Sequence, residues 1–191
     1  MKFKNLFSNC NRRTVVIVFD KDVDLTSWGF VNFLARNIFA AYNGYVFSLV
    51  DSSIKDVIEI IATLDKPFVV AYGNAVSPIE EALDKTNNYI RRVFIRPVIN
   101  EKIVQSLAGN ISDYDIENTF TIISADDCKM YEKSDEKGFL TQYRKKHPRF
   151  LSISGMYDNE KSSVEALNGL HSIYGYMLQI GHDPYAEPIN E

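Results

Sequence analysis

The sequence is poor in the residues that mark fibrous, disulfide-bonded, membrane-spanning and nucleic-acid-binding proteins. Its 9 glycines and 6 prolines among 191 residues exclude a collagen-like or low-complexity chain. Its two cysteines, Cys10 and Cys128, are too few for a disulfide scaffold, and neither belongs to a CxxC pair of the kind that binds zinc. No apolar run approaches the ~18 residues of a membrane span. Basic residues do not exceed acidic ones (21 against 25, net charge −4), which argues against a nucleic-acid partner.

What the sequence does contain is enough apolar material for one folded domain. Hydrophobic residues make up 46% and aromatic residues 13% of the chain, which is too much for a disordered protein. The length fits a single domain over residues 1–191, with an N-terminal extension at 1–13 and an irregular tail at 182–191. The basic N-terminus lacks the apolar core and cleavage site of a signal peptide. We therefore expect a soluble, cytoplasmic protein with two unpaired thiols.

Short apolar runs alternate with longer segments of helical period. Strands are predicted at 14–19, 45–50, 68–72, 92–96, 120–124 and 150–154. Helices are predicted at 27–42, 53–64, 78–85 (with Ser77 as its cap), 101–107, 136–146 and 164–180. Apolar strands without polar alternation are typical of a parallel sheet that is buried on both faces. The pattern predicts an α/β fold, a three-layer sandwich around a mostly parallel six-stranded sheet.

In a sheet of this kind, functional side chains gather at the carboxyl ends of the strands. The residues that follow the predicted strands include several polar ones. They are Asp20 and Asp22 after the first strand, Gly73 and Asn74 after the third, Asp126 and Asp127 after the fifth, and Met156 and Tyr157 after the sixth.

Taken in order, these segments resemble a minimal α/β hydrolase. Residues 14–53 resemble the first strand, oxyanion loop, first helix and second strand of such enzymes, and residues 65–83 (DKPFVVAYGNAVSPIEEAL) resemble the strand, elbow and helix that present the nucleophile. FTIISADD (120–127) is similar to the strand that supplies the acid, and FLSISGMYDN (150–159) to the strand that precedes the histidine. The resemblance spans residues 14–180 and concerns order and spacing.

The sequence departs from the family at each catalytic position. Gly73 stands where the elbow G-x-S-x-G carries the serine, and it has no side chain to form an acyl-enzyme. Asp20 follows the first strand, where the family carries His-Gly, and its charge would repel an oxyanion. No histidine lies between Met156 and Ser162, and His147 is expected at the surface. Without the histidine, an aspartate at the acid position has no imidazole to orient.

The sequence therefore predicts a pseudoenzyme, a non-catalytic binding, accessory or regulatory protein without a cofactor or metal. Its partner would be a protein or a small ligand, and the last predicted helix offers an apolar face for a homodimer. No catalytic residue is expected to be intact. The predicted pocket is lined by Asp20, Asp22, Gly73, Asn74, Asp127, Met156 and Tyr157.

Two alternative hypotheses assign a catalytic activity to the protein. Asp20 and Asp22 resemble the D-x-D of a haloacid-dehalogenase-like phosphohydrolase, in which Asp20 would be the nucleophile and Mg²⁺ would be held by Asp20, Asp22 and Asp126. Ser52 and Lys102 would then contact the phosphate. The other alternative is an atypical esterase or thioesterase that acts through unusual residues.

Overall fold

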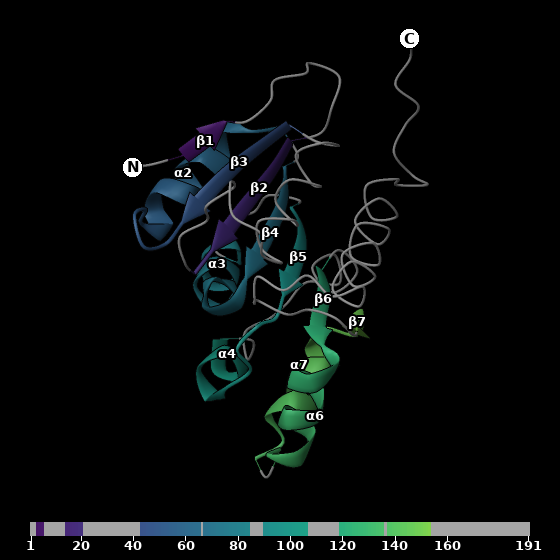
Figure 1. Ribbon diagram of the computed structural model, residues 1–191. Coiled ribbons are helices and arrows are strands. Elements are labelled where there is room, and N and C mark those ends of the chain that lie inside the picture. The colour runs from purple at the N-terminus through teal and green to yellow at the C-terminus, as the bar shows by residue number, and fades with distance from the viewer. Residues whose placement is uncertain are drawn as a thin grey trace.

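The computed structural model describes residues 3–5, 14–20, 43–65, 67–84, 90–106, 119–135 and 137–153. Seven strands in this part of the chain form one sheet in the order β1-β3-β2-β4-β5-β6-β7 (Figure 1). Their bounds are β1 Phe3–Asn5, β2 Thr14–Phe19, β3 Asn43–Ser48, β4 Phe68–Tyr72, β5 Arg91–Ile95, β6 Thr119–Ser124 and β7 Phe150–Ile153. Strands β2 to β7 all run parallel, and β1 pairs antiparallel with β3. The α/β class with a mostly parallel sheet is confirmed.

The central strands are buried on both faces, as their unbroken apolar sequences predict. All five residues from Val15 to Phe19 are fully buried, and β4 is buried along its whole length. Burial of this extent requires β-branched and aromatic side chains on both sides of the strand. The hydrophobic core therefore lies along β2, β4 and β5, directly beneath the rim at which these strands end.

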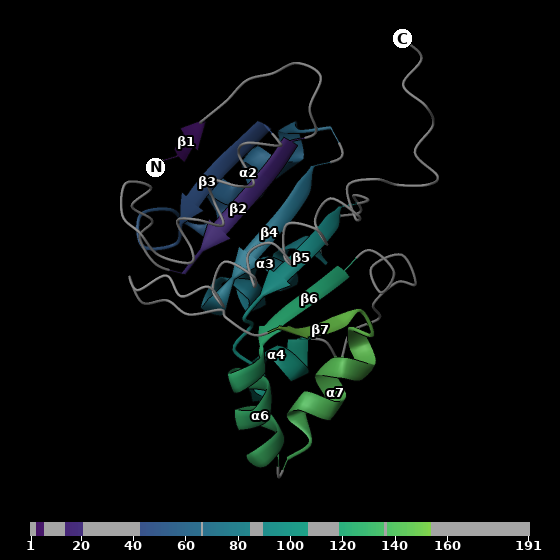
Figure 2. The same ribbon diagram turned by 45° about the vertical axis from the view of Figure 1, so that its right-hand side comes forward.

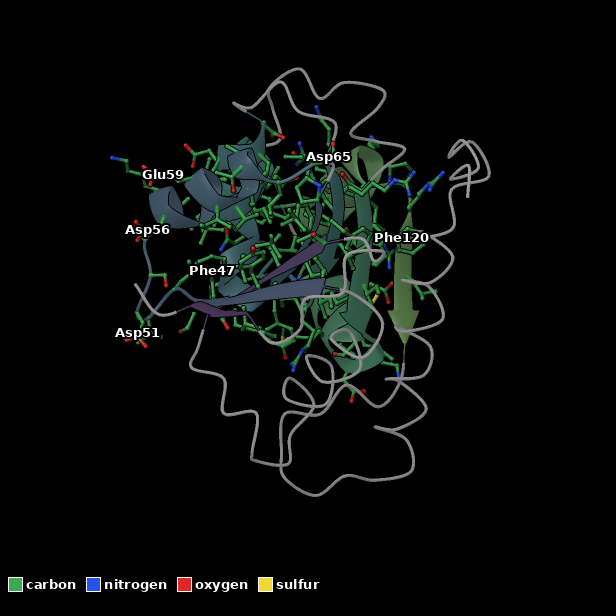
Figure 3. All side chains as sticks on the ribbon, turned by 90° about the horizontal axis from the view of Figure 1, so that it is seen from above. Phe47, Asp51, Asp56, Glu59, Asp65 and Phe120 are labelled. Carbon is green, nitrogen blue, oxygen red and sulfur yellow. The ribbon has the colours of Figure 1, made fainter. Side chains whose placement is uncertain are left out.

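Helices α2 (Ile54–Thr63), α3 (Val76–Leu83), α4 (Glu101–Ser106) and α7 (Phe139–Lys146) are neighbours in that order. They form a helical layer along the sheet, which is visible in Figure 2. Helix α2 shows why they pack: Val57 and Ile61 are buried, whereas Asp56 and Glu59 lie on its outer side (Figure 3). None of the described helices is long and apolar enough to cross a bilayer.

The structure differs from the sequence prediction at the start of α3. The chain leaves β4 through a short 3-10 turn, η1 (Gly73–Ala75), and enters α3 at Val76. Ser77 therefore lies inside the helix and is not its cap. Its buried hydroxyl has no hydrogen-bond partner in the described part of the chain. The tight turn leaves no loop in which a capping residue would stand, so the expected helix start at residue 78 was wrong.

Two further elements were not predicted. Helix α6 (Ala125–Lys133) begins directly after β6, and Ser124 caps it by accepting a hydrogen bond from the backbone of Asp127 at 2.9 Å. Strand β1 adds an antiparallel edge within the residues 1–13 that were treated as an extension. The predicted helices at 27–42 and 164–180 and the tail at 182–191 lie outside the described residues.

Candidate functional site

A pocket of about 340 Å³ opens at the carboxyl edge of the sheet. It collects residues from the ends of three strands and from the helix that follows a fourth. Its lining consists of Asp20 after β2, Tyr72 and Gly73 at the end of β4, Arg96, Pro97 and Val98 after β5, and Asp127 and Tyr131 on α6. This is the edge at which parallel α/β sheets bind their ligands.

Gly73 forms the elbow between β4 and α3. Its φ of +63° lies in the left-handed region, which glycine adopts without the steric cost that a side chain imposes. A second constraint acts on the same position. An ideal Cβ on Gly73 would lie 2.8 Å from Cγ and 3.0 Å from Oδ1 of Asp20, which is closer than real Cβ contacts allow. The carboxylate of Asp20 therefore occupies the space in which a side chain at position 73 would stand.

Asn74 holds this carboxylate in place. Its backbone N–H and its side-chain amide both donate to Oδ2 of Asp20, at 2.8 Å and 3.0 Å. In the hydrolases that the sequence resembles, the backbone N–H after the elbow nucleophile belongs to the oxyanion hole. Here that donor is engaged by a carboxylate. The second oxygen of Asp20, Oδ1, has no hydrogen-bond partner among the described residues.

Arg96 ties the pocket walls together. Its Nε and Nη2 donate to the two carboxylate oxygens of Asp127, at 2.8 Å and 3.4 Å, and its Nη1 donates to the Tyr72 hydroxyl at 3.3 Å. Burial acts to lower the pKa of Arg96, but the hydrogen bonds and charge of Asp127 and Tyr72 outweigh it, so the pKa lies above its usual value. The hydrogen bonds of the Arg96 side chain link β4, β5 and α6. The backbone of Arg96 has a φ of +48°, which is the sole positive φ at a described residue other than glycine.

Tyr131 closes the wall that α6 contributes. Its hydroxyl accepts a hydrogen bond from the backbone N–H of Ile99 at 3.2 Å, which joins α6 to the loop after β5. Burial raises the pKa of the Tyr131 hydroxyl, and the charge of Asp127 raises it further. The phenol therefore remains neutral at physiological pH and serves as an acceptor for this backbone group.

The structure brings together four of the residues that the sequence singled out. Asp20, Gly73 and Asp127 line the pocket, and Asn74 binds Asp20 from the start of η1. Asp126 is exposed in the first turn of α6 and is not part of the lining, and Ser52 does not line it either. Asp22, Met156 and Tyr157 lie outside the described residues.

Sequence reasoning missed the other half of the pocket. Tyr72, Arg96, Pro97, Val98 and Tyr131 line it, although the sequence analysis gave none of them a role. One signal was available: Arg96 and Pro97 directly follow a buried strand, in the same position as Asp20. Tyr131 gave no such signal, because it belongs to a helix that was not predicted.

His147 is not at the surface, as was expected, but in the core. Its Nε2 lies 2.8 Å from Oε1 of Glu80 on α3, and its ring packs against Tyr143 with centroids 4.6 Å apart. Burial raises the pKa of Glu80, while the neighbouring imidazole opposes that rise. The prediction failed because the basic run before His147 belongs to the exposed face of α7, whereas the helix end turns inward. His147 does not line the pocket.

The described residues hold no group of three or more histidine, cysteine, aspartate or glutamate side chains that could bind a metal ion. Of the three ligands in the magnesium alternative, Asp20 and Asp126 are the two that the structure describes, and they do not share the pocket. Asp127 does share it with Asp20, but its carboxylate is engaged by Arg96. The phosphohydrolase arrangement therefore gains no support from the described geometry.

Comparison with known proteins rests on structure, since no protein-family model and no curated protein matches the sequence. AqDC, solved with its product and described as recognising and cleaving the ring of the Pseudomonas quinolone signal, has a TM-score of 0.52 and 9% identity, covering 95% of this chain and 96% of AqDC. The ydeN gene product of B. subtilis has a TM-score of 0.50 and 12% identity, covering 88% and 98%. A protein assigned to the alpha/beta hydrolase superfamily, from Xanthomonas campestris pv. campestris, has a TM-score of 0.49 and 8% identity, covering 88% and 98%.

Two of these structures, AqDC and the ydeN gene product, reach a TM-score of 0.50 or more and carry the comparison. At such low identities the likeness concerns the fold and not the chemistry. Three observations support the same fold: the order of the parallel strands, the elbow between β4 and α3, and the near-complete coverage of these two structures. This chain has the α/β-hydrolase fold.

Proposed function

We propose that this protein binds a small ligand in the pocket at the carboxyl edge of its sheet and performs no serine-hydrolase chemistry. One observation carries the proposal: the carboxylate of Asp20 fills the elbow at Gly73 and accepts the backbone N–H of Asn74. The position that would present a nucleophile and the donor that would stabilise an oxyanion are thus both taken by a single anionic side chain.

The physical chemistry of acyl transfer argues in the same direction. The reaction needs a nucleophile activated by a base, and donors aimed at the negative charge that develops on the substrate oxygen. Glycine offers no nucleophile, and a carboxylate beside the donor opposes the developing charge. His147, the one histidine in the described part of the chain, packs against Glu80 and is buried away from the pocket lining.

Binding is supported by the size and the construction of the pocket. Small-molecule pockets range from about 300 to 1,000 Å³, so a volume of about 340 Å³ suits a small ligand. Its walls are cross-linked by Arg96, which contacts both Asp127 and Tyr72. A pre-organised pocket lowers the entropic cost of binding, because fewer side chains must be ordered when the ligand arrives.

Two assays test this proposal. We expect no turnover of a panel of p-nitrophenyl and thioester substrates, and no labelling by a fluorophosphonate probe. Covalent labelling of a serine, or ester turnover that is lost on changing a pocket residue, would overturn the proposal in favour of an atypical esterase. A p-nitrophenyl phosphate assay with Mg²⁺ covers the phosphohydrolase alternative, which requires metal-dependent turnover that Asp20→Asn abolishes.

The cytoplasmic location and the accessory or regulatory role stay predictions from the sequence. Self-association through the helix expected at 164–180 also stays a prediction, because those residues lie outside the described part of the chain. Size-exclusion chromatography with light scattering tests it, and a monomer at micromolar concentration would exclude a stable homodimer.

A further inference from the structure

We propose that the pocket is specific for small organic ammonium ions and that Asp20 is their counter-ion. This inference rests on the proposed function and adds the chemical class of the ligand. It starts from the charges that the described residues place along the pocket, which are carried by Asp20, Arg96 and Asp127. These three charges are not equivalent.

Arg96 and Asp127 neutralise each other through a two-point fork at 2.8 Å and 3.4 Å. Asp20 has no cationic partner among the described residues that line the pocket. Its Oδ2 accepts both donors of Asn74, which fixes the position of the carboxylate, whereas its Oδ1 has no hydrogen-bond partner in the described part of the chain. The described part of the lining therefore carries a net charge of −1, located on a partly buried carboxylate with one oxygen still able to accept hydrogen bonds.

The rest of the lining favours a cation with an apolar body. Tyr131 supplies an aromatic side chain, and Pro97 and Val98 supply aliphatic surface. Aromatic rings attract ammonium groups through their quadrupoles, and apolar surfaces bind the carbon skeleton. An anionic ligand would meet the charge of Asp20, and it would gain the guanidinium of Arg96 only by displacing Asp127. The charge of Asp20 and the apolar lining therefore both favour a small amine in its protonated form.

Three probes of matched shape test the inference on the whole protein: benzylammonium, benzyl alcohol and benzoate. Binding is measured by calorimetry or by protein NMR shifts at constant ionic strength near neutral pH. We expect the wild-type protein to bind benzylammonium at least about tenfold more tightly than benzyl alcohol, and benzoate not at all. Raising the salt concentration should weaken the binding of benzylammonium and leave that of benzyl alcohol unchanged.

Two variants locate the counter-ion. Asp20→Asn keeps an oxygen that can accept from Asn74 and removes the charge, so its preference for benzylammonium over benzyl alcohol should disappear. Asp126→Asn is the matched control, because it removes an identical charge from an exposed residue that does not line the pocket. This control should keep the preference. Circular dichroism checks that both variants are folded.

Equal binding of benzylammonium and benzyl alcohol by the wild-type protein would overturn the inference without any variant. Preferential binding of benzoate, or a preference that survives in folded Asp20→Asn, would overturn it as well. These results leave the proposed function intact, since the pocket would still bind a ligand without hydrolysis. Ester turnover would instead overturn the proposed function, and the comparison of the three probes would still decide the ligand class.

Discussion

Nε2 of His147 lies 2.8 Å from Oε1 of Glu80, and the two side chains are exposed by only 2% and 1%. The pair joins the C-terminal end of α7 to the middle of α3. Phe94 and Tyr143 pack their rings against the imidazole, with centroids 5.9 Å and 4.6 Å away. A carboxyl group in such apolar surroundings makes stability sensitive to the protonation of Glu80.

The first prediction concerns the pH dependence that Glu80 contributes. Burial raises the pKa of Glu80 above its ordinary value of 4.5, so the folded protein retains a proton that the unfolded chain releases. The resulting stabilisation is complete below pH 4.5 and is lost as the pH rises through the raised pKa. In urea unfolding, wild type should therefore lose stability relative to Glu80→Gln as the pH rises through this range.

The exposed neighbour on the same helix provides the control for this measurement. Glu81→Gln should change the free energy of unfolding by no more than about 0.5 kcal/mol, with little dependence on pH, as is usual for surface substitutions. A difference between wild type and Glu80→Gln that stays constant from pH 4 to pH 8 would contradict the assignment of this titration to Glu80.

The second prediction concerns the two glycines with positive φ. Gly73 and Gly138 have φ values of +63° and +66°, but the nearest atom to a Cβ on Gly138 would be Nε2 of Gln142 at 3.8 Å. Gly138→Ala should cost about 1 kcal/mol for the backbone conformation alone. Gly73→Ala should cost more, because the new methyl group collides with Asp20. Chemical denaturation of both variants measures the difference.

A double-mutant cycle isolates the collision with the carboxylate. Combining Gly73→Ala with Asp20→Ala should cost less than the sum of the two single changes, by about 0.5 to 3 kcal/mol, as for other residues in direct contact. Strict additivity would mean that Asp20 does not occupy the elbow.

The third prediction concerns the capping box of α2. The Ser53 hydroxyl accepts the backbone N–H of Asp56 at 3.2 Å and donates to Oδ2 of Asp56 at 2.9 Å, and the backbone N–H of Ser53 donates to the same oxygen at 3.1 Å. These bonds to Ser53 lower the pKa of Asp56. Ser53→Ala should destabilise the protein by about 1 kcal/mol and raise the pKa of Asp56 toward its ordinary value.

NMR titration of the Asp56 carboxyl measures that change. The direction of the pH dependence follows from the lowered pKa of Asp56. The electrostatic contribution of the cap to stability is present above pH 3.8, the ordinary pKa, and is lost as the pH falls through the pKa of the folded protein. An Asp56 titration that is identical in Ser53→Ala and in wild type would exclude Ser53 as the cause.

The fourth prediction compares two arginine–aspartate pairs. Arg92 Nη1 lies 2.7 Å from Oδ1 of Asp84 with the arginine side chain 3% exposed, whereas the Arg96 side chain in its pair with Asp127 is 24% exposed. Removing the partner of a buried charge costs more than removing the partner of a partly exposed one. We expect Asp127→Asn to lower the free energy of unfolding by about 1 kcal/mol and Asp84→Asn to lower it by more. Thermal and urea unfolding rank the two variants, and the reverse order would contradict this account.

The central strands could be predicted closely because their unbroken apolar sequences fit only a strand that is buried on both faces. The bounds of β2 and β4 agree with the predicted 14–19 and 68–72, since an unbroken run such as TVVIVF suits only a strand covered on both faces. Helix α6 escaped prediction because ADDCKMYEK has little apolar periodicity and buries only Cys128. Its start depends on the cap by Ser124, which the sequence analysis placed at the end of the strand predicted at 120–124.

The pocket was predictable only in part, for a related reason. The order of strands and helices placed Asp20, Gly73 and Asp127 at one edge of the sheet, because parallel strands end on the same side. It did not indicate that the carboxylate of Asp20 fills the elbow, that Arg96 engages Asp127, or that His147 meets a glutamate 67 positions earlier (147 − 80). Such pairings depend on side-chain directions at the rim and between helices, which periodicity does not fix.

The crowding between Asp20 and position 73 also sets the order in which mutations can convert this scaffold into a hydrolase. A serine introduced first at position 73 would meet both an unfavourable backbone angle and an occupied space. Shortening Asp20 first removes the steric obstacle and releases the amide of Asn74 for a substrate oxygen. Any laboratory selection for esterase activity from this sequence should therefore pass through loss of Asp20 before a hydroxyl or thiol becomes established at the elbow.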